Sequence, residues 1–442
     1  MNKRQLIPIA LVFMTVLSVY YMFDSKFQTA AKYDAAVAEG DRQVESGVMV
    51  KALESYEKAI ALSPSPELLK KVAEGYLKND DYYSAKRWYE RRMVTKYPKE
   101  SSTYDFGIHM YIEHGDYENA FQAYDTAVKR NALSNQGEQL INQIQYVNEL
   151  VGSYKEVKSF GNDHIAAVLD YDDKWIFIDT SGMNAFSGKF DKTDNCVQEK
   201  AAVVKDGQAM YIDINGDPVI TDGYIMEKNS DIDTISEFRD IQSNLILAKV
   251  DDVWNYYDAT TYEKQHGGYF DATLATLGIC GVARGMTSWA IADSKGNLIT
   301  DYIYESVVVD ERGILARNEC YFAQNSLMYY LYDLTGKEIA GPYDEARAFN
   351  DNTYAAVKKN DRWIFVDAQG HEKDLGNFEN AKSFSNGLAP VQIDGNWGYI
   401  DMNGNVVIDC QFVDANMITG YGVGFVKINT MWKILKLISK NH

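Results

Sequence analysis

The chain has 442 residues, of which 46% are hydrophobic, and a formal net charge of −19. This length exceeds what one compact core usually holds, so two or three structural regions are expected, and the hydrophobic content excludes a largely disordered protein. The strong negative charge disfavours nucleic acid as a partner, because Lys and Arg must neutralise the phosphates.

An uncharged stretch from Leu6 to Phe23 lies near the N-terminus. As a helix it extends roughly 27 Å at about 1.5 Å per residue, close to the thickness of one hydrocarbon core. Lys3 and Arg4 precede it, and a basic flank stays on the cytoplasmic side. The sequence therefore predicts residues 1–30 as a cytoplasmic tip and single-pass anchor in the cytoplasmic membrane, with the C-terminal region extracellular.

A cleaved signal peptide is the alternative interpretation of this segment. Signal peptides usually have a shorter apolar region, followed closely by a small-residue cleavage site. The single candidate site, Thr29-Ala30-Ala31, lies well beyond Phe23. We therefore favour an anchor that is not cleaved.

Residues 31–150 show the apolar spacing of amphipathic helices and repeat at intervals of 33 and 35 residues. The first unit resembles the tetratricopeptide repeat in its spacing of small, aromatic and proline residues, and residues 135–150 are expected to form a capping helix. Arg92 and Ala132 depart from the family pattern. The positions that carry the resemblance are Gly40, Ala52, Tyr56, Ala59 and Pro64 in the first unit, Tyr76, Ala85 and Tyr89 in the second, and Tyr111, Ala120, Tyr124 and Ala127 in the third.

The resemblance to tetratricopeptide repeats implies a concave face that is built from the first helix of each unit and binds extended peptides or partner helices. A solvated helix face is the plain alternative, because three units form only a shallow groove. The positions that would line the groove are Lys70, Glu74, Lys78, Asp105, His109 and Glu113.

Residues 151–442 switch to the alternating pattern of β-strands, with Asn-Gly and Asp-Gly hairpin turns. A large anchor residue recurs along this region, usually followed after four residues by Asp and after seven by Gly. Asp can accept hydrogen bonds from turn N–H groups, and Gly accepts the positive φ of the turn. The anchors are Trp175, Trp254, Trp289, Trp363, Trp397 and Trp432, while Ala209 and Tyr329 hold the same register where Trp is absent.

The phrase Asn396-Trp397-Gly398-Tyr399-Ile400-Asp401, with the preceding Gly387-Leu388-Ala389-Pro390-Val391, resembles the WG-repeat family of bacterial proteins. The resemblance implies an all-β repeat architecture and leaves the activity open. We expect a β-propeller of seven or eight blades, since closure removes exposed strand edges. An open β-solenoid is the alternative. The last unit, around Trp432, is partial, and residues Tyr154 to Phe160 are expected to complete its sheet.

The sequence carries no recognisable catalytic motif, so we expect neither an enzyme nor a cofactor. The segment Asp213–Asp217 resembles half a calcium loop, but Tyr224 stands where Glu is required, and no metal is expected. Cys196, Cys280, Cys320 and Cys410 are widely spaced, which is typical of buried thiols.

A membrane-anchored extracytoplasmic scaffold is the function that this organisation favours. Its expected partners are other envelope proteins or peptides, together with the lipid bilayer through Leu6–Phe23, and no nucleic acid. A protein that binds carbohydrate or cell-wall polymer is the alternative, which aromatic clusters at Tyr256-Tyr257 and Tyr329–Tyr332 would support if they are exposed. A hydrolase is less favoured, because no catalytic constellation is visible.

Overall fold

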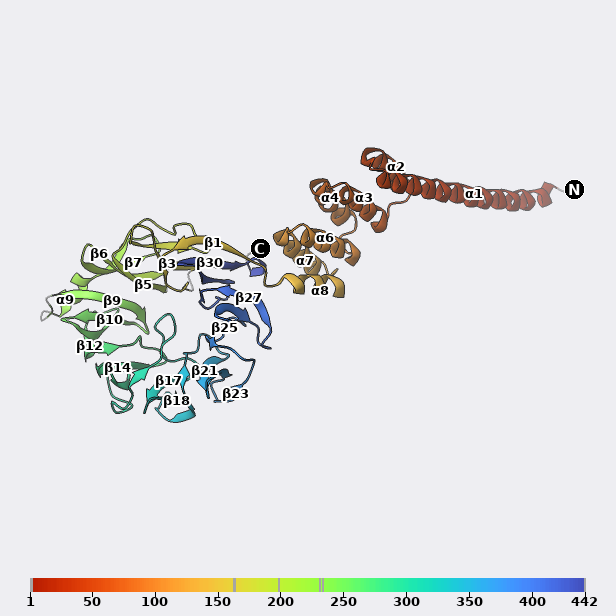
Figure 1. Cartoon of the computed structure of the whole chain (residues 1–442). Helices are drawn as coiled ribbons and strands as arrows, with labels where there is room; N and C mark the ends of the chain where they lie inside the picture. The colour runs from red at the N-terminus through yellow and green to blue at the C-terminus, as the bar shows by residue number, and fades with distance from the viewer. Residues whose placement is uncertain (1–2, 162–163, 198, 230–231, 233, 441–442) are drawn as a thin grey trace. The chain divides into compact units, whose positions relative to one another are not determined.

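The protein divides into two compact units, Met1–Val147 and Asn148–Asn441, in a computed structural model. The structure describes the backbone of residues 3–161, 164–197, 199–229, 232 and 234–440, and few of the side chains before Lys26. The first unit is helical and the second is built from β-strands (Figure 1). A helical N-terminal region followed by an all-β region is the order that the sequence predicts.

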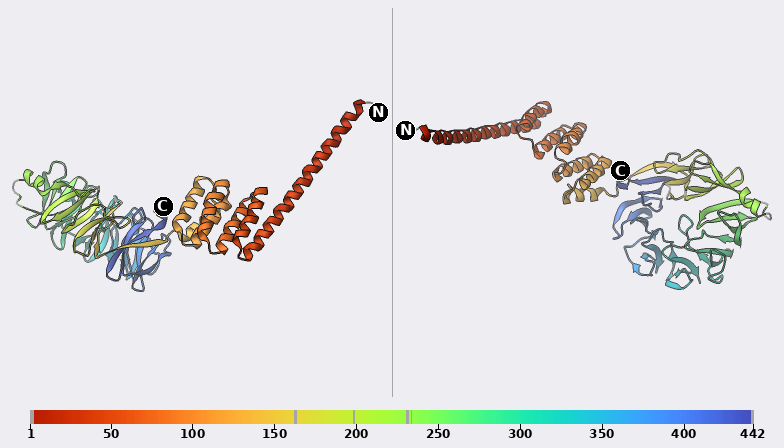
Figure 2. Two further views of the ribbon diagram at one scale, coloured as in Figure 1. Left: turned by 90° about the horizontal axis from the view of Figure 1, so that it is seen from above. Right: turned by 180° about the vertical axis from the view of Figure 1, so that it is seen from behind.

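The helical unit is a succession of helix pairs, which Figure 2 shows stacked side by side. A five-residue π-helical turn, η1, widens the second helix of the middle pair. The helices are α1 (Lys3–Glu45), α2 (Met49–Leu62), α3 (Pro66–Lys78), α4 (Tyr82–Trp88), η1 (Tyr89–Met93), α5 (Val94–Lys96), α6 (Ser101–Glu113), α7 (Tyr117–Lys129) and α8 (Asn135–Ile144).

Close packing between paired helices explains the small residues of this unit. A Cβ added at Gly40 would come within 2.5 Å of the Tyr56 ring, and one added at Gly107 would come within 2.2 Å of the Tyr89 ring. Only glycine lets these aromatic rings lie flat against the neighbouring helix. Helix α3 begins at a well-formed cap, because the hydroxyl of Ser65 accepts a hydrogen bond from the Leu68 N–H at 3.1 Å.

The capping helix is shorter than predicted. Helix α8 ends at Ile144, and Asn148–Leu150 belong to a β-strand. The apolar residues of this segment have the spacing of a helix, but pairing with a distant strand overrides that local preference.

Helix α1 includes the stretch for which we predict a membrane anchor. Most side chains of Leu6–Phe23 lie outside the described residues. Within the part that the structure describes, no helix combines the length and apolarity needed to cross a membrane. The anchor and the cellular location therefore stay predictions.

The β unit is an eight-bladed propeller: eight antiparallel sheets follow one another around a ring (Figures 1 and 2). In blades 1 and 4 the outermost strand is reduced to isolated bridges, Trp175 to Phe190 and Trp289 to Tyr304. Blades 1 to 4 consist of β2 (Glu156–Val157), β3 (Ile165–Leu169) and β4 (Trp175–Asp179); β5 (Lys192–Val197), β6 (Lys200–Lys205), β7 (Gln208–Asp213) and β8 (Pro218–Thr221); β9 (Ile235–Gln242), β10 (Leu245–Val250), β11 (Val253–Asp258) and β12 (Lys264–Tyr269); and β13 (Asp271–Ala272), β14 (Ile279–Gly285) and β15 (Ser288–Asp293).

The remaining four blades have four strands each, and a short helix, α9 (Asp222–Lys228), lies between blades 2 and 3. Blades 5 to 8 consist of β16 (Ser306–Val307), β17 (Cys320–Asn325), β18 (Met328–Asp333) and β19 (Glu338–Tyr343); β20 (Glu345–Ala346), β21 (Ala355–Lys359), β22 (Arg362–Val366) and β23 (Glu372–Lys373); β24 (Asn380–Ala381), β25 (Ala389–Ile393), β26 (Asn396–Ile400) and β27 (Val406–Phe412); and β28 (Asp414–Ala415), β29 (Val423–Ile428), β30 (Met431–Leu437) and β1 (Asn148–Tyr154).

Blade 8 closes the ring, because the first strand of the unit completes the last sheet. Strand β1 pairs antiparallel with β30, with Asn148 opposite Leu437 and Tyr154 opposite Trp432. This confirms a closed propeller and contradicts the open solenoid. The closing strand, however, is not the predicted Tyr154–Phe160: it lies earlier, because Glu156–Val157 within that segment forms the first strand of blade 1.

Each repeat anchor lies on the third strand of its blade. Trp254, Trp363 and Trp397 are buried, whereas Trp175, Trp289 and Trp432 are half-buried. Cys196, Cys280 and Cys320 are buried free thiols and Cys410 is partly buried, as the spacing predicts.

In most blades the turn after the third strand is held by the aspartate that follows the anchor. In blade 7 the Oδ1 atom of Asp401 accepts hydrogen bonds from the N–H groups of Asn403 at 2.8 Å and Asn405 at 2.9 Å, and Gly404 has φ of 87°. The same paired acceptance, from the residues two and four positions later, occurs at Asp179, Asp213, Asp293, Asp333 and Asp367. Asp213 therefore has the turn role that the sequence predicts.

Ring closure predicts that damage in blade 8 will reach blade 1. Phe425 is 1% exposed and its ring stacks on Phe160 at 4.9 Å between centroids, within a core that includes Ala166 and Val168. Phe425→Ala should destabilise the β unit by about 3–5 kcal/mol and reduce hydrogen-exchange protection at β3. The matched control is Phe365→Ala, a buried ring packed on Phe384 at 4.8 Å. If both variants lose the same hydrogen-exchange protection at β3, the effect on blade 1 does not depend on its contact with blade 8, and the prediction is contradicted.

The turn aspartates predict loss of stability in acid. Burial alone would raise the pKa of Asp401, but hydrogen bonds from Asn405 and Asn403 outweigh it and lower the pKa below its usual value. A lowered folded-state pKa stabilises the fold above the unfolded pKa of about 3.9, and this contribution disappears as pH falls through the folded value. Asp401→Asn keeps an acceptor oxygen but removes the charge. Its free energy of unfolding should therefore fall below that of wild type at about pH 7, and this difference should shrink at about pH 3.

Urea unfolding at both pH values measures this difference. The control is Asp394→Asn, which changes an exposed aspartate in the neighbouring turn and should give the same small effect at both pH values. A deficit of Asp401→Asn that does not vary with pH would show that the carboxylate charge adds nothing to the turn.

Candidate functional site

The helical unit gathers most of the predicted groove residues around one open cavity of about 340 Å³. Helix α3 supplies Lys70 and Glu74 to its lining, and helix α6 supplies Asp105, His109 and Glu113. Phe106 forms an apolar patch of the same lining, with Lys70 Nζ 5.8 Å from its ring centroid. Lys78 is exposed in the last turn of α3 and is not part of the lining. The structure therefore brings five of the six residues together.

The groove is acidic overall. Glu74 lies 3.6 Å from Lys70 Nζ, and Glu113 lies 3.6 Å from His109 Nε2, so both carboxylates have a nearby basic group within the groove. The carboxylate of Asp105 accepts a hydrogen bond from the hydroxyl of Ser134. Three carboxylates against one lysine and one histidine give a surface suited to ligands that bring positive charge or hydrogen-bond donors.

The aromatic clusters do not form an exposed platform for sugar stacking. Tyr256 and Tyr257 are each 1% exposed, and the hydroxyl of Tyr256 donates to the Thr273 carbonyl at 2.6 Å. Leu331 and Tyr332 are buried, and Tyr329 and Tyr330 are half-buried. Packing between neighbouring blades covers both sides of the strand that carries Tyr256 and Tyr257, so these two residues give no support to the carbohydrate-binding alternative.

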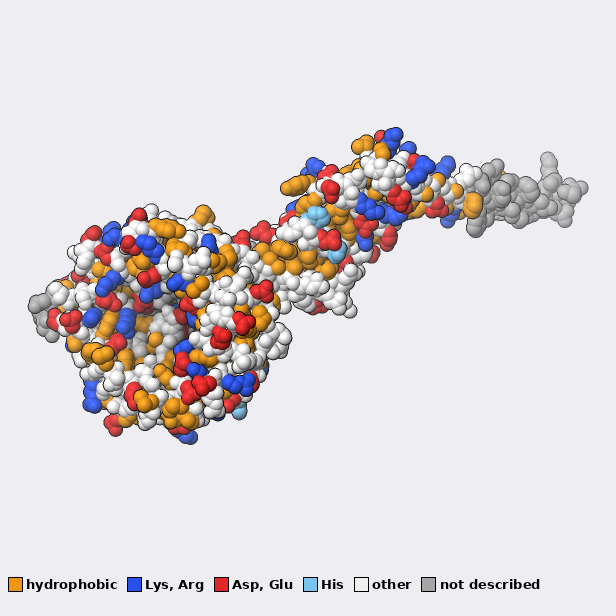
Figure 3. Space-filling view, in the orientation of Figure 1, with side chains coloured by type: hydrophobic (Ala, Val, Ile, Leu, Met, Phe, Trp, Pro, Cys, Tyr) orange, Lys and Arg blue, Asp and Glu red, His pale blue; other side chains and the backbone are white. Residues whose placement is uncertain are grey.

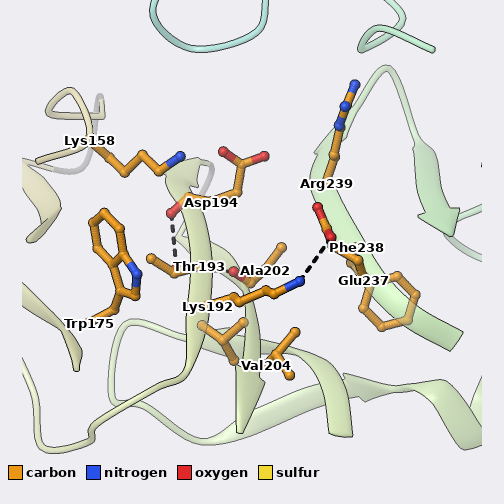
Figure 4. A pocket seen from close by; sticks show the side chains of 11 residues that line it. Lys158, Trp175, Lys192, Thr193, Asp194, Ala202, Val204, Glu237, Phe238 and Arg239 are labelled. Carbon is orange, nitrogen blue, oxygen red and sulfur yellow. Dashed lines mark hydrogen bonds and ion pairs between the residues drawn. The ribbon is translucent and has the colours of Figure 1, made fainter. Parts of the chain in front are cut away.

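The β unit contains a cavity of about 370 Å³ at the inner ends of blades 1 to 3 (Figure 4). A second cavity, also of about 370 Å³, extends toward blade 5 and shares Lys158, Asp194 and Arg239 with the first. Figure 3 shows the β unit hollowed at its middle, with acidic and basic side chains around the hollow.

Buried acids surround this inner region. Burial and the neighbouring Asp194 raise the pKa of Asp240 well above its usual range. Burial also raises the pKa of Asp194, although Lys158 and Arg239 oppose the shift. Neither oxygen of Asp240 has a hydrogen-bonding partner within the described residues. Buried acceptors that lack donors are uncommon in folded proteins and call for a specific explanation.

A loop of blade 5 crosses the middle of the ring. The Oε2 atom of Glu311 accepts a hydrogen bond from the Ser159 hydroxyl of blade 1 at 2.7 Å, and its Oε1 lies 3.9 Å from Lys382 Nζ of blade 7. Side chains from blades that are not neighbours can meet only at the centre. Burial raises the pKa of Glu311, while Lys382 and Ser159 lower it. Nearby, Asp310 binds Arg312 at 3.1 Å and Arg317 at 3.2 Å.

The sequence did not reveal this inner site, although it held one clue. Ala209 occupies a register position where most units have an aromatic residue. In the structure the third strand that carries it belongs to blade 2, whose inner strand lines the cavity. Within the described residues no three His, Cys, Asp or Glu side chains come together as a metal site.

The C-terminal repeats match a known family model. The model described as WG containing repeat matches residues 331–363, 376–397 and 397–432, which lie in blades 5 to 8. This confirms the resemblance for that part of the chain, and for the earlier repeats the resemblance stays a prediction. No curated protein matches the chain.

Several solved structures are similar to parts of the chain. BamB from Moraxella catarrhalis is 11% identical over 63% of this chain and 83% of its own, with a TM-score of 0.31. The β-propeller domain of Cps50 (Swd1) from Myceliophteria thermophila is 10% identical over 66% of this chain and 99% of its own, with a TM-score of 0.34. The Sgt2 TPR domain from Aspergillus fumigatus is 21% identical over 25% of this chain and 74% of its own, with a TM-score of 0.21. At these scores no function is transferred from any of them.

Proposed function

We propose that the protein is a membrane-anchored, extracytoplasmic scaffold that binds protein partners without catalysing a reaction. The observation that carries this proposal is the open cavity of the helical unit, where Glu74, Asp105, His109 and Glu113 meet beside the exposed Lys70. The side chains come from two successive helix pairs, α3 and α6, so an extended segment lying across them would contact both. Repeated helix pairs commonly present such concave surfaces to partners.

The charge of the groove indicates the chemistry of the partner segment. Three carboxylates face one lysine and one histidine, so a segment that carries Lys or Arg gains electrostatic attraction, whereas an acidic segment is repelled. The ring of Phe106 in the same lining offers one apolar contact. We therefore propose a basic, extended segment of another envelope protein as the ligand of the groove.

The anchor part of the proposal rests on the sequence. Leu6–Phe23 is long enough for one hydrocarbon core, and Lys3 and Arg4 precede it. Thr29–Ala31, the small-residue candidate for cleavage, lies inside helix α1, whereas proteolytic cleavage favours exposed loops and extended segments. This supports an anchor that stays attached and a C-terminal region outside the cytoplasm.

Charge reversal tests the groove. The double variant Glu74→Lys, Glu113→Lys should lose partners that wild type captures from detergent-solubilised membranes, because the groove then repels a basic segment. Removing two favourable charge contacts should weaken binding by roughly ten-fold or more. The measurement is quantitative mass spectrometry of proteins captured on the purified full chain.

The control variant is Glu54→Lys, Glu118→Lys, which makes the same charge change at exposed helix positions outside the groove lining. It should capture the same partners as wild type. A partner set lost equally from both double variants would reflect overall charge, and a set retained by both would contradict binding in the groove.

Protease accessibility tests the topology. With any wall removed, intact cells treated with a protease should lose the full-length band, because the region after Asp24 is expected outside the cytoplasm. A cytoplasmic protein of the same cells should remain intact and serves as the control. Protection of the full chain until the cells are lysed would reverse the proposed orientation.

A further inference from the structure

Blades 1, 3, 6 and 7 share a contact between an inner basic residue and the repeat tryptophan. In blades 3 and 7 a basic side chain on or beside the first strand lies over the indole of its own blade and forms an ion pair with an aspartate at the first strand of the next blade. This pairing neutralises the cation and covers the ring. The contacts are Arg239 with Trp254 at 4.3 Å and Asp271 at 3.1 Å, and Lys382 with Trp397 at 5.3 Å and Asp414 at 3.0 Å.

Blade 2 departs from this pattern at all three positions. Its third strand carries Ala209 in place of the indole, and its first strand carries Asp194 in place of the basic residue. Lys192 takes the place of the aspartate that would pair with the basic residue of blade 1. Blade 5 also departs at these three positions, with Ser306, Val308 and Tyr329, whereas blade 2 exchanges the acid and the base for residues of opposite charge, Lys192 and Asp194.

The cavity of about 370 Å³ opens where these changes meet (Figure 4). Ala209 pairs directly with Val204, which lines the cavity beside Ala202. The half-buried ring of Trp175 and the ring of Phe238 lie on either side. Ala209 itself is buried and does not reach the lining. The apolar part of the lining comes from Trp175, Val204 and Phe238, and the volume is one that small ligands occupy in proteins.

Lys158 is the cation left without a partner by these changes. Its ammonium lies 5.8 Å from the centroid of Trp175, as the shared contact requires. The aspartate that would neutralise it is replaced by Lys192, whose own ammonium lies 3.5 Å from Glu237. Among the residues that the structure describes, Lys158 Nζ forms no ion pair or hydrogen bond.

Asp194 and Asn195 supply acceptors opposite this cation. One extra residue between Thr193 and Cys196 makes a β-bulge in β5, a feature that re-aims side chains and is frequent beside functional sites. Asn195 is 1% exposed, lines the adjoining cavity, and has an Oδ1 atom with no hydrogen-bonding partner in the described part of the chain. Figure 4 shows Asp194 and Lys158 pointing into the same space from opposite sides, yet they form no ion pair within 4 Å.

We propose that this cavity binds a free α-amino acid with an apolar side chain. The carboxylate of the ligand pairs with the ammonium of Lys158, and its ammonium pairs with Asp194, which lines both this cavity and the adjoining one that the side-chain Oδ1 of Asn195 lines. The apolar side chain of the ligand lies against Val204, Trp175 and Phe238 in the lining. Asp194 Oδ1 accepts hydrogen bonds from the backbone N–H and the side-chain amide of Asn195 at 3.1 and 3.2 Å, but no basic group lies within 4 Å of it among the described residues. A ligand with both charges brings an opposite charge to each group, whereas a simple anion would face Asp194 and a simple cation would face Lys158. This site is separate from the helical groove and does not depend on the function proposed for it.

Isothermal titration of the purified full chain with L-leucine, L-phenylalanine and L-glutamate tests the proposal. Leucine or phenylalanine should bind at one saturable site, and glutamate should bind at least ten-fold more weakly because its side chain is charged. N-acetyl-L-leucine and L-leucinamide each lack one charge, and each should also bind at least ten-fold more weakly, as expected for loss of a charged hydrogen bond. Absence of heat for all apolar amino acids up to about 10 mM, above a Kd of about 1 mM, would overturn the proposal, as would equal affinity for leucine and N-acetyl-leucine.

Three variants place the site. Lys158→Met and Asp194→Asn should weaken leucine binding at least ten-fold, and Ala209→Trp should abolish it by filling the cavity while the melting temperature stays within the range of the other variants. The Ala209→Trp variant could overpack the blade. If that variant fails to fold, the Lys158→Met and Asp194→Asn variants are sufficient to test the proposal. The matched control is Lys427→Met, which removes a lysine 5.6 Å from Trp432 in blade 8 and should bind leucine like wild type. Leucine binding that survives all three variants would place it elsewhere and overturn the proposal.

Discussion

The pairing of β1 with β30 joins the two ends of the β unit in one sheet, and the ring depends on it. Without β1, blade 8 would expose the edge of β30, and blade 1 would lose the core it shares with blade 8. An exposed strand edge is a template for pairing with other chains. Closure therefore removes the main hazard of a repeated β architecture. It also fixes the centre of the ring, where Ser159, Glu311 and Lys382 from three separate blades come together.

Around this closed ring, two local contacts recur in several blades. An aspartate accepts two backbone hydrogen bonds in the turn, and a basic side chain lies over the indole in blades such as 3 and 7. Both contacts use only residues that are close in the sequence or in neighbouring blades, so each blade can vary without disturbing the ring. Blade 2 uses this freedom: Ala209 and Asp194 take the places of the indole and the base, and a cavity lined by Lys158 and Asp194 lies there.

The two units offer binding surfaces of different kinds. The helical groove is open, acidic and lined by exposed side chains such as Glu113 and His109, which suits an extended partner that keeps contact with solvent. The cavity of the propeller combines the apolar groups of Val204, Phe238 and the half-buried Trp175 with charged groups such as Lys158 and Asp194, which suits a small ligand with both apolar and charged parts. A scaffold with both surfaces can hold a protein partner at one unit and a small molecule at the other, because the residues involved are independent.

The sequence by itself determined the order of the regions, the repeat register and the chemistry of the turns. Apolar spacing separates helices from strands, and the interval between Trp397, Asp401 and Gly404 is a local property that three-dimensional packing does not change. It also placed five of the six groove residues on helix faces that do meet, because residues at equivalent positions of stacked repeats share a face.

Only the tertiary structure decided the eighth blade, the identity of the closing strand and the inner cavity. Asn148–Tyr154 has no local signal that distinguishes it from the end of a helix, and its strand forms because β30 offers an unpaired edge. Alternation along a strand predicts that one of Tyr256 and Tyr257 is buried and the other exposed, yet neighbouring blades bury both. The inner cavity depends on Lys158 of blade 1, Asp194 of blade 2 and Arg239 of blade 3 meeting in space, and contacts of that kind arise from the packing of successive blades rather than from any one stretch of sequence.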